Sequence, residues 1–524
     1  MIYSRVALTA AAIAAAATAP ILQAEQRNQD SSTRTPIKHV VVLFQENRPF
    51  DHYFGTYPNA LNLPGEPQFQ PRPRTPQVNG LTYELLHNNP NKVQPFRLGP
   101  GDVVECSQTH VYKNEQQAAD GALTDKLLMD KFVENDGATN KQGVPTDDGS
   151  PFCDPSMVMG YFDGNTVTAL WNYAQRFAMS DNSFATNWGS SAVGAINLIS
   201  GNTHGAQMNG VPVDVIGTDI VGGSVIGNPR PELDDCSPAT TNRITMAGRT
   251  IGDLLNEKGI TWGWFNGGFR AADPTKTCTA SHLGSNSQPQ ADYIPHHEPF
   301  QYYPSTANRQ HVPPSSPESI GLTDQANHQY DLDLDFWPAA ESGHLPAVSF
   351  IKAPAYEEGH NRYSDSLVEQ RYLVETINRL QRLPEWKEMA ILIVWDDSDG
   401  LYDHQPPPLV NASNTSQDAL TGPNSCGQSA AGAYQGRCGY GPRLPFLVVS
   451  PFAKSNFVDH TLTDQTSVIR FIEDNWGLGR IGDQSFDDRA GSIENMFDFS
   501  RHGSARHLFL DPATGQPIEQ EDNR

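Results

Sequence analysis

Two long apolar runs, residues 37–44 and 389–395, dominate the hydrophobic pattern of this chain. Runs of this length with few polar interruptions predict strands that are buried on both faces, as in a parallel sheet. Each run stops abruptly at a pair of oxygen-bearing side chains: Glu46 and Asn47 after the first, Asp396 and Asp397 after the second. Because chemistry in open α/β sheets collects at the carboxyl ends of strands, we expect both pairs to form one site.

Helix–strand units are the second pattern. Residues 250–258 and 364–380 have helical periodicity, and strand-like segments follow them at 260–265 and 389–395. Such units predict an α/β fold, with a central mixed, mostly parallel β-sheet sandwiched by helices. A further buried strand is predicted at 444–450, and further helices at 115–134, 166–177 and 467–474.

We expect one catalytic domain over residues 37–500. Loop insertions are predicted at 56–160, 205–245, 270–340 and 405–440, where turn residues are frequent and periodicity is weak. Residues 25–36 are predicted to be a flexible N-terminal segment, and residues 501–524 a polar C-terminal tail.

Residues 1–24 have the pattern of a signal peptide. Arg5 is their only charge, residues 6–19 are small and apolar, and residues 22–24 fit a cleavage site. We therefore expect an exported bacterial protein, secreted or periplasmic. No later segment has enough consecutive apolar residues to cross a bilayer, so stable membrane insertion is not expected.

Export would place the six cysteines in an oxidising compartment. We expect neighbours to pair in order, because each such bridge closes one loop-rich segment: Cys106–Cys153, Cys236–Cys278 and Cys426–Cys438. None of the cysteines has CxxC spacing, which argues against a thiolate zinc site.

The formal net charge of −24 limits the classes of molecule that we expect this chain to bind. Nucleic acids and anionic membrane surfaces are recognised through basic patches, so neither is expected as a partner. An anionic substrate would have to be attracted by a bound cation and by local histidines.

A serine pair lies at the start of a predicted helix. Small residues lead into an apolar helical run that stops at Gly201, which places Ser190 and Ser191 at the helix N-terminus. Free N–H groups and the helix dipole can hold a phosphate there, and a hydroxyl can act as nucleophile. A serine at this position can also be only an N-cap. The sequence leaves both interpretations open, and it leaves open which hydroxyl would act.

The strand-end residues Glu46, Asn47, Asp396 and Asp397 are hard oxygen ligands. They suit one divalent cation such as Mg²⁺, Ca²⁺ or Mn²⁺. Paired aspartates also end strands for purely structural reasons, but two such ends in one chain favour a metal site.

Histidines in loops are candidate phosphate ligands. His360 follows the strand-like segment 347–351, where a general acid would lie, and His296 and His297 suggest two donors into one pocket. His404 follows the aspartate pair closely enough to support it. A lone loop histidine, such as His110, is more often inert.

With these motifs, the chain resembles the bacterial phosphoesterase family that contains phospholipases C and acid phosphatase A. The resemblance covers residues 37–500, and its motifs are the Glu46-Asn47 block through Gly55, the segments 194–198 and 262–264, and the aspartate pair with His404. It implies an architecture related to alkaline phosphatase. The segment 57–60, the long excursion after it and the serine resemble the acid phosphatase branch more than the phospholipases.

The resemblance also implies roles for individual residues. Ser191 would be the nucleophile, and the four strand-end residues would bind the metal, with Asn47 also facing the phosphate. The histidines that would surround the phosphoryl group are His110, His296, His297 and His360, with His404 nearby.

These features together predict an exported, metal-dependent acid phosphatase that hydrolyses phosphomonoesters through a phosphoserine. The alternative among phosphoesterases is a phospholipase C that acts on phospholipid head groups. Its substrates are diesters with a large apolar part, which need a wide apolar mouth at the site. Four aromatic residues could line such a mouth: Trp188, Trp262, Trp264 and Phe265. A non-enzymatic alternative is an exported protein that binds metal or phosphate without turnover. A sulfatase is not favoured, because its maturation motif is missing near the serine.

Overall fold

The structure is a computed structural model that describes residues 32–119, 127–135, 155–422, 425–500 and 506–518. The predicted signal peptide lies outside these residues, as do most of the N-terminal segment and Cys153.

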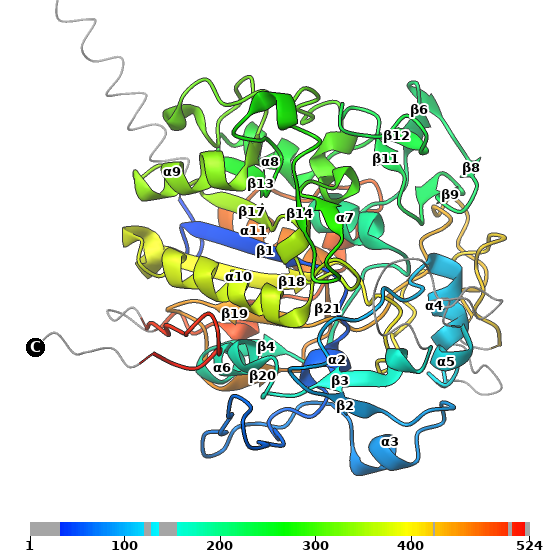
Figure 1. The fold of residues 1–524 in the computed structure, drawn as a ribbon. Coiled ribbons are helices and arrows are strands. Elements are labelled where there is room, and N and C mark those ends of the chain that lie inside the picture. Colours follow the sequence, from blue (N-terminus) through cyan, green and yellow to red (C-terminus); the bar gives the residue numbers. More distant parts are fainter. Residues whose placement is uncertain (1–31, 120–126, 136–154, 423–424, 501–505, 519–524) are drawn as a thin grey trace, which may run out of the picture.

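An eight-stranded sheet forms the centre of the protein (Figure 1). Its spatial order is β16 (Gln329–Asp331), β13 (Trp262–Asn266), β17 (Val348–Lys352), β1 (His39–Gln45), β18 (Met389–Trp395), β19 (Phe446–Val449), β4 (Ala178–Ser180) and β20 (Phe457–Asp459). Only β19 among these strands runs against the others. The predicted α/β class with a mixed, mostly parallel sheet is therefore confirmed.

The register of the central strands brings distant polar residues together. β1 pairs in parallel with β17 and with β18, so that Phe44 lies beside Lys352 and Gln45 beside Trp395. Glu46 and Asp396 consequently leave the sheet next to each other, at its carboxyl edge. This arrangement confirms that the two apolar runs are neighbours, as their shared pattern suggested.

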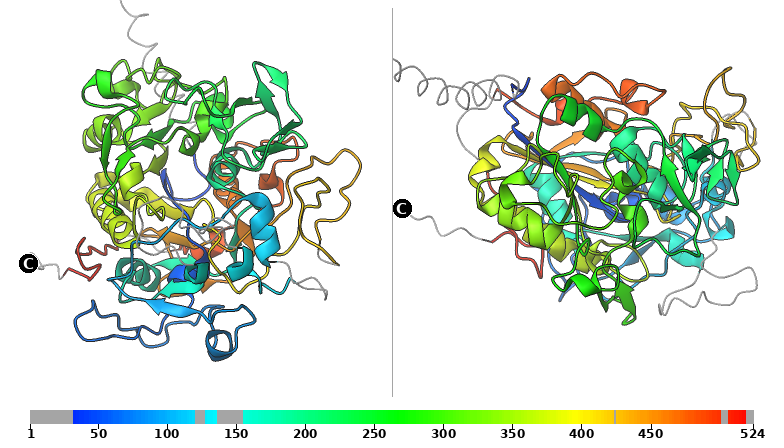
Figure 2. Two further views of the ribbon diagram at one scale, coloured as in Figure 1. Left: turned by 45° about the vertical axis from the view of Figure 1, so that its right-hand side comes forward. Right: turned by 90° about the horizontal axis from the view of Figure 1, so that it is seen from above.

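Helices lie on both sides of the sheet (Figures 1 and 2). In Figure 1, α10 (Ser366–Leu380) crosses in front of the central strands and α11 (Thr466–Trp476) lies behind them. α6 (Thr168–Arg176) packs against α10, whereas α7 (Ser191–Ser200) packs against α11 and α8 (Ile251–Glu257). The Asp365 side chain caps α10 by accepting hydrogen bonds from two backbone N–H groups of its first turn.

The remaining helices and strands are short. The helices are α2 (Phe50–Phe54), α3 (Tyr83–His87), α4 (Tyr112–Ala119), α5 (Phe132–Asn135) and α9 (Trp337–Glu341). The outer strands are β2 (Phe96–Leu98), β3 (Gly160–Phe162), β5 (Ser183–Phe184), β6 (Ala206–Met208), β7 (Val211–Pro212), β8 (Val215–Ile216), β9 (Ile220–Val221), β10 (Ser224–Val225), β11 (Arg230–Pro231), β12 (Arg243–Met246), β14 (Ser281–Leu283), β15 (Pro289–Ala291) and β21 (Thr463–Asp464).

Three regions differ from their sequence pattern. The single helix predicted over 115–134 is wrong, because α4 ends at Ala119 and residues 127–131 are not helical. Within the predicted insertion 270–340, β16 joins the main sheet as its edge strand. In the C-terminal segment, Leu510 is fully buried and its carbonyl accepts a hydrogen bond from Asn378 of α10. Sequence periodicity carries no information on such long-range packing.

Two of the expected disulfides are present among the described residues, Cys236–Cys278 and Cys426–Cys438. Cys106 is also disulfide-bonded, and the partner expected for it lies outside those residues. In the described part of the chain, no helix has both the length and the apolar character needed to cross a membrane.

α7 packs tightly against the end of β18. A Cβ atom built on Gly194 would lie 2.2 Å from the carbonyl oxygen of Asp396. Only a glycine lets the helix come this close, and Gly201 then ends the helix in the left-handed conformation, with φ 59°. The first turn of α7 is thereby fixed over the carboxyl edge of the sheet.

Gly194→Ala should therefore push α7 away from Asp396 and lower the free energy of unfolding by about 1–3 kcal/mol, the usual cost of overpacking. Chemical denaturation of the purified protein measures this difference. Gly101→Ala is the matched control, because nothing lies within 4 Å of a Cβ at that position. Equal stability of the two variants would contradict the expectation.

Candidate active site

Ser191 is the first residue of α7 and lies at the carboxyl edge of the sheet. Its hydroxyl oxygen is 3.1 Å from Asp397 Oδ2 and 3.3 Å from Glu46 Oε2. The side chain therefore bridges the two strand ends that the sequence placed in one site.

Ser190 is the N-cap residue of the same helix, but its hydroxyl points elsewhere. It donates a hydrogen bond to the backbone carbonyl of His110, at 3.2 Å. The two hydroxyls that the sequence could not distinguish thus have different surroundings, and Ser191 is the one that contacts the strand-end carboxylates.

The strand-end carboxylates are crowded and buried. Burial and the neighbouring Asp396 raise the pKa of Glu46 well above its usual value. The same two causes raise the pKa of Asp397. Such shifts arise when negative charges are held together without enough positive charge to balance them.

Lys352, at the end of β17, supplies one buried positive charge. Its ammonium lies 2.6 Å from Glu46 Oε1 and 2.6 Å from Glu358 Oε2. His297 Nδ1 borders the same two carboxylates, at 3.4 and 3.2 Å. Burial and the nearby Lys352 hold the pKa of His297 well below its usual value, so its ring is neutral at physiological pH.

Asn47 joins the two strand ends through its backbone. Its N–H donates to Asp396 Oδ1 at 2.8 Å, and its φ of 51° is in the left-handed region. The side-chain oxygens Asn47 Oδ1 and Asp396 Oδ2 are buried without a hydrogen-bond partner in the described residues. Since buried polar atoms are normally satisfied, these two oxygens are suited to hold a ligand.

Asp399 is a central residue of the site that sequence reasoning missed. It accepts hydrogen bonds from Ser107 Oγ, Gln108 N–H and Asn361 Nδ2, at 3.0, 3.1 and 2.7 Å. Its Oδ1 also lies 2.9 Å from His110 Nδ1. The signal was available in the sequence, because Asp399 comes two residues after the recognised pair, in Asp396-Asp397-Ser398-Asp399.

His110 is held in a charged form by this arrangement. Burial alone would lower its pKa, but Asp397 and Asp399 outweigh burial and hold the pKa of His110 well above its usual value. The ring of His360 meets that of His110 edge to face, with centroids 6.2 Å apart. Burial lowers the pKa of His360, whose ring stacks on Tyr363 at 4.4 Å. His110 and His360 thus lie together.

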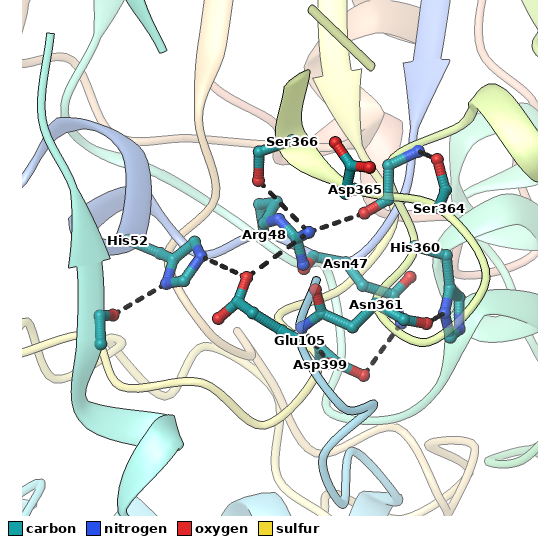
Figure 3. Close-up of polar contacts among 12 residues, drawn as sticks. Asn47, Arg48, His52, Glu105, His360, Asn361, Ser364, Asp365, Ser366 and Asp399 are labelled. Carbon is teal, nitrogen blue, oxygen red and sulfur yellow. Dashed lines mark hydrogen bonds and ion pairs between the residues drawn. The ribbon is translucent and has the colours of Figure 1, made fainter. Parts of the chain in front are cut away.

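A buried polar network lies behind Asn47 (Figure 3). Figure 3 shows Glu105 facing both Arg48 and His52; its Oε2 is 3.8 Å from Arg48 Nη2 and 3.3 Å from His52 Nε2. The backbone carbonyl of Glu105 accepts from Arg362 N–H at 2.8 Å. The segment from Glu105 to His110 is therefore fixed at both ends across the carboxyl edge of the sheet.

A model of the phosphoesterase family matches residues 37–479 of this chain. The chain belongs to the phosphoesterase family.

Named relatives of this phosphoesterase are phospholipases C. The non-hemolytic phospholipase C of Pseudomonas aeruginosa is 25% identical over 455 residues, which cover 84% of this chain and 54% of that protein. The non-hemolytic phospholipase C of Burkholderia pseudomallei is 27% identical over 474 residues, 85% of this chain and 56% of that protein. This chain thus spans about half the length of those two relatives. Phospholipase C A of Mycobacterium tuberculosis is 24% identical over 459 residues, 85% of this chain and 74% of that protein.

A solved structure of a protein in the alkaline phosphatase superfamily from Vibrio parahaemolyticus aligns with 60% of this chain and 62% of its own, at 11% identity and a TM-score of 0.28. That similarity is too low to support an argument about this phosphoesterase.

The donor set of this chain fits a divalent cation. Glu46, Asp396 and Asp397 are hard oxygen donors whose charges Lys352 balances only in part, and Asn47 adds an amide oxygen without a hydrogen-bond partner in the described residues. The described residues also group Glu46 with His297 and Glu358, and His110 with His360 and Asp399, as further potential metal ligands.

The four aromatic residues that could line an apolar mouth do not do so. Trp262, Trp264 and Phe265 are part of the main hydrophobic core, and all of them are fully buried. Trp188 is 1% exposed and belongs to a second core cluster.

The structure brings only some of the predicted phosphate ligands together. His296 is buried beside His297, with ring centroids 4.3 Å apart, and its Nδ1 has no hydrogen-bond partner in the described residues. His404 lies in a different cluster: its Nδ1 is 2.5 Å from Asp51 Oδ2, beside Arg443. No contact joins His404 to Ser191 or the strand-end carboxylates in the part of the chain described here.

The His404–Asp51 pair should make stability depend on pH. The carboxylate of Asp51 outweighs burial and raises the pKa of His404, so the charged pair stabilises the fold below about pH 6.5 and this contribution is lost as pH rises through the raised pKa. His404→Asn should cost about 2 kcal/mol at low pH and less above neutrality.

Urea denaturation at several pH values measures that difference. His460→Asn is the matched control, because His460 also contacts an aspartate, Asp181, but its side chain is 66% exposed. A cost for His404→Asn that is independent of pH would contradict the assignment.

Proposed function

We propose that this protein is a metal-dependent phosphomonoesterase in which Ser191 is the nucleophile. The observation that carries the proposal is the position of the Ser191 hydroxyl, at the start of α7 and 3.1 and 3.3 Å from the two strand-end carboxylates. The N-terminus of a helix also attracts the phosphate group that such a nucleophile attacks.

The residues proposed to hold one divalent cation are Glu46, Asn47, Asp396 and Asp397. The cation would lower the pKa of the serine hydroxyl and offset the negative charge on the transferring phosphoryl group. Its identity, among Mg²⁺, Ca²⁺, Mn²⁺ and similar ions, is left to experiment.

In the proposed reaction, the Ser191 hydroxyl passes its proton to Asp397, 3.1 Å away, as its oxygen attacks phosphorus. The bond to the ester oxygen breaks, the leaving oxygen takes a proton from the His110–His360 pair, and a phosphoserine and a free alcohol result. Water then attacks the phosphoserine and gives a proton back to the histidine pair; the bond between phosphorus and the Ser191 oxygen breaks, that oxygen takes its proton back from Asp397, and inorganic phosphate is released. Asp399 holds His110 in position for both steps.

A phosphomonoester is favoured over a phospholipid because the catalytic residues are enclosed. Ser191 and Asp397 are 2% and 1% exposed, and the four aromatic residues that could line an apolar mouth are buried in the core: Trp188, Trp262, Trp264 and Phe265. Phospholipase C remains the second candidate, since the relatives named above are phospholipases C.

Export is proposed from the pattern of residues 1–24 and agrees with the disulfides.

The test is parallel hydrolysis of an aryl phosphomonoester and an aryl phosphocholine diester by the purified protein with divalent cations. Faster turnover of the monoester supports the proposal. Preference for the choline diester would assign the protein to phospholipase C. Binding of phosphate without hydrolysis of either ester would favour the non-enzymatic alternative.

A further inference from the structure

A partly buried arginine that has no ionic partner among the described residues borders the proposed site. Arg230 belongs to β11, and its Nη1 atom is buried without a hydrogen-bond partner in the described residues. Of the three buried arginines in the described part of the chain, Arg48 and Arg443 face the carboxylates of Glu105 and Asp51, and Arg437 donates to two backbone carbonyls. Burial lowers the pKa of Arg230, although nearby tyrosines and Asp219 act in the opposite direction. A partly desolvated guanidinium without a partner is costly unless an anion binds to it.

Packing places the strand of Arg230 next to one of the histidine pairs of the site. β11 packs against the turn Pro295–His297, which carries His296 and His297. Tyr363, the residue on which His360 stacks, is among the groups that act on the charge of Arg230. Two residues before Arg230, Asn228 Oδ1 accepts a hydrogen bond from Ala192 N–H in the first turn of α7, at 3.0 Å.

The backbone around Arg230 is fixed. Its N–H donates to the Asn242 carbonyl at 2.7 Å, and the preceding carbonyl, of Pro229, accepts from Tyr302 OH at 2.5 Å. Pro229 and Pro231 restrict the chain on both sides. A rigid backbone lowers the entropy lost when the arginine side chain is ordered by a ligand.

Arg230 is less buried than the catalytic residues. Ser191 and Asp397 are almost completely buried, whereas Arg230 is of intermediate exposure. In the proposed reaction the transferring phosphoryl group binds at the buried serine, so the rest of the substrate extends outward, toward less buried residues such as Arg230.

We propose that Arg230 recognises a second anionic group, a carboxylate or a further phosphate, on the phosphomonoester substrate. This inference rests on the proposed phosphomonoesterase function. A guanidinium binds either anion through charge-assisted, often bidentate hydrogen bonds, and it repels a quaternary ammonium. Substrates with a second negative charge are therefore preferred over neutral ones, and choline-bearing substrates are disfavoured.

The experiment compares kcat/KM within matched substrate pairs. Phosphoglycerate differs from glycerol phosphate by a carboxylate in place of a hydroxymethyl group, and fructose bisphosphate differs from fructose monophosphate by a second phosphate. The wild-type protein, Arg230→Gln, Arg230→Lys and Arg243→Gln are assayed. Arg243 pairs with Arg230 on the neighbouring strand β12, so Arg243→Gln controls for the loss of one nearby positive charge.

In at least one pair, the wild-type protein should prefer the substrate that carries a second anionic group. The pair that shows this preference identifies the anion as a carboxylate or a phosphate. Arg230→Gln should lower that preference about tenfold or more, as expected for loss of one charge-assisted hydrogen bond. Arg230→Lys should keep part of the preference and Arg243→Gln all of it. An equal loss of kcat/KM for both members of each pair would overturn the proposal, because a structural role or a contact with the transferring phosphoryl group leaves their ratio unchanged.

Failure of the proposed function is a separate outcome. If the wild-type protein hydrolyses no phosphomonoester, ligand-induced thermal stabilisation decides the inference instead. Stabilisation by phosphoglycerate that exceeds stabilisation by glycerol phosphate, and that is lost in Arg230→Gln, supports it. Equal stabilisation by both ligands in the wild-type protein contradicts it.

Discussion

Ser191→Ala is expected to lower kcat for an aryl phosphomonoester by at least about 10⁴-fold, because it removes the atom that bonds to phosphorus. The hydroxyl is small and lies at the end of a helix whose other contacts do not change, so the free energy of unfolding should change little. Initial-rate assays with divalent cation present measure the effect. Acid quenching of the wild-type reaction, followed by mass spectrometry of the peptide that carries Ser191, should show one added phosphoryl group.

Ser190→Ala is the matched control for this variant. Its hydroxyl contacts only the His110 carbonyl among the described hydrogen bonds, so we expect a loss of less than about tenfold. If Ser190→Ala lost nearly all activity and Ser191→Ala kept it, the nucleophile would be Ser190 instead. Survival in both variants would exclude a phosphoserine at this helix.

Removal of divalent cations should abolish hydrolysis and also lower the stability of the protein. Without a cation, the carboxylates of Glu46, Asp396 and Asp397 repel one another in a buried site that Lys352 neutralises only in part. A cation present at about 100 times its dissociation constant would stabilise the folded state by about 2.7 kcal/mol. Thermal unfolding of chelator-treated protein, with Mg²⁺, Ca²⁺ and Mn²⁺ added separately, measures this gain for each ion.

Variants of the aspartate pair separate metal binding from other effects of the added ions. Asp397→Asn relieves part of the repulsion, so the metal-free variant should be at least as stable as the metal-free wild type, yet it should gain much less from added cation. Asp474→Asn is the control, because Asp474 is paired with Arg480 away from the site. A wild-type unfolding temperature that does not respond to any of the ions would contradict the metal site.

The site shows which residues could be found from sequence and which could not. Glu46 and Asp396 were found because each ends a long apolar run, and strand ends are visible in a linear pattern. Asp399 was missed although it lies two residues from the recognised pair, because its importance comes from five partners that are distant in sequence. His404 was placed near the phosphate by its proximity in sequence, but it contacts Asp51 instead.

Lys352 and Arg230 illustrate a second limit. Lys352 ends the predicted strand 347–351, yet a lysine at a strand end is ordinarily a solvated charge. Only the parallel pairing of β17 with β1 buries it against Glu46. Arg230 lies in a predicted loop insertion, and its position beside His297 depends on how β11 packs against a turn from another insertion.

The sequence by itself determined the α/β class, the central strands and the two clusters of oxygen donors at their ends. These features arise from the local alternation of apolar and polar residues, and local periodicity is encoded in the chain directly. The tertiary structure alone decided which serine faces the carboxylates, which histidines share the site and that Arg230 has no ionic partner among the described residues. Those properties depend on strand register, on the close approach of α7 at Gly194 and on the packing of the insertions, and each is fixed by contacts between residues far apart in the chain.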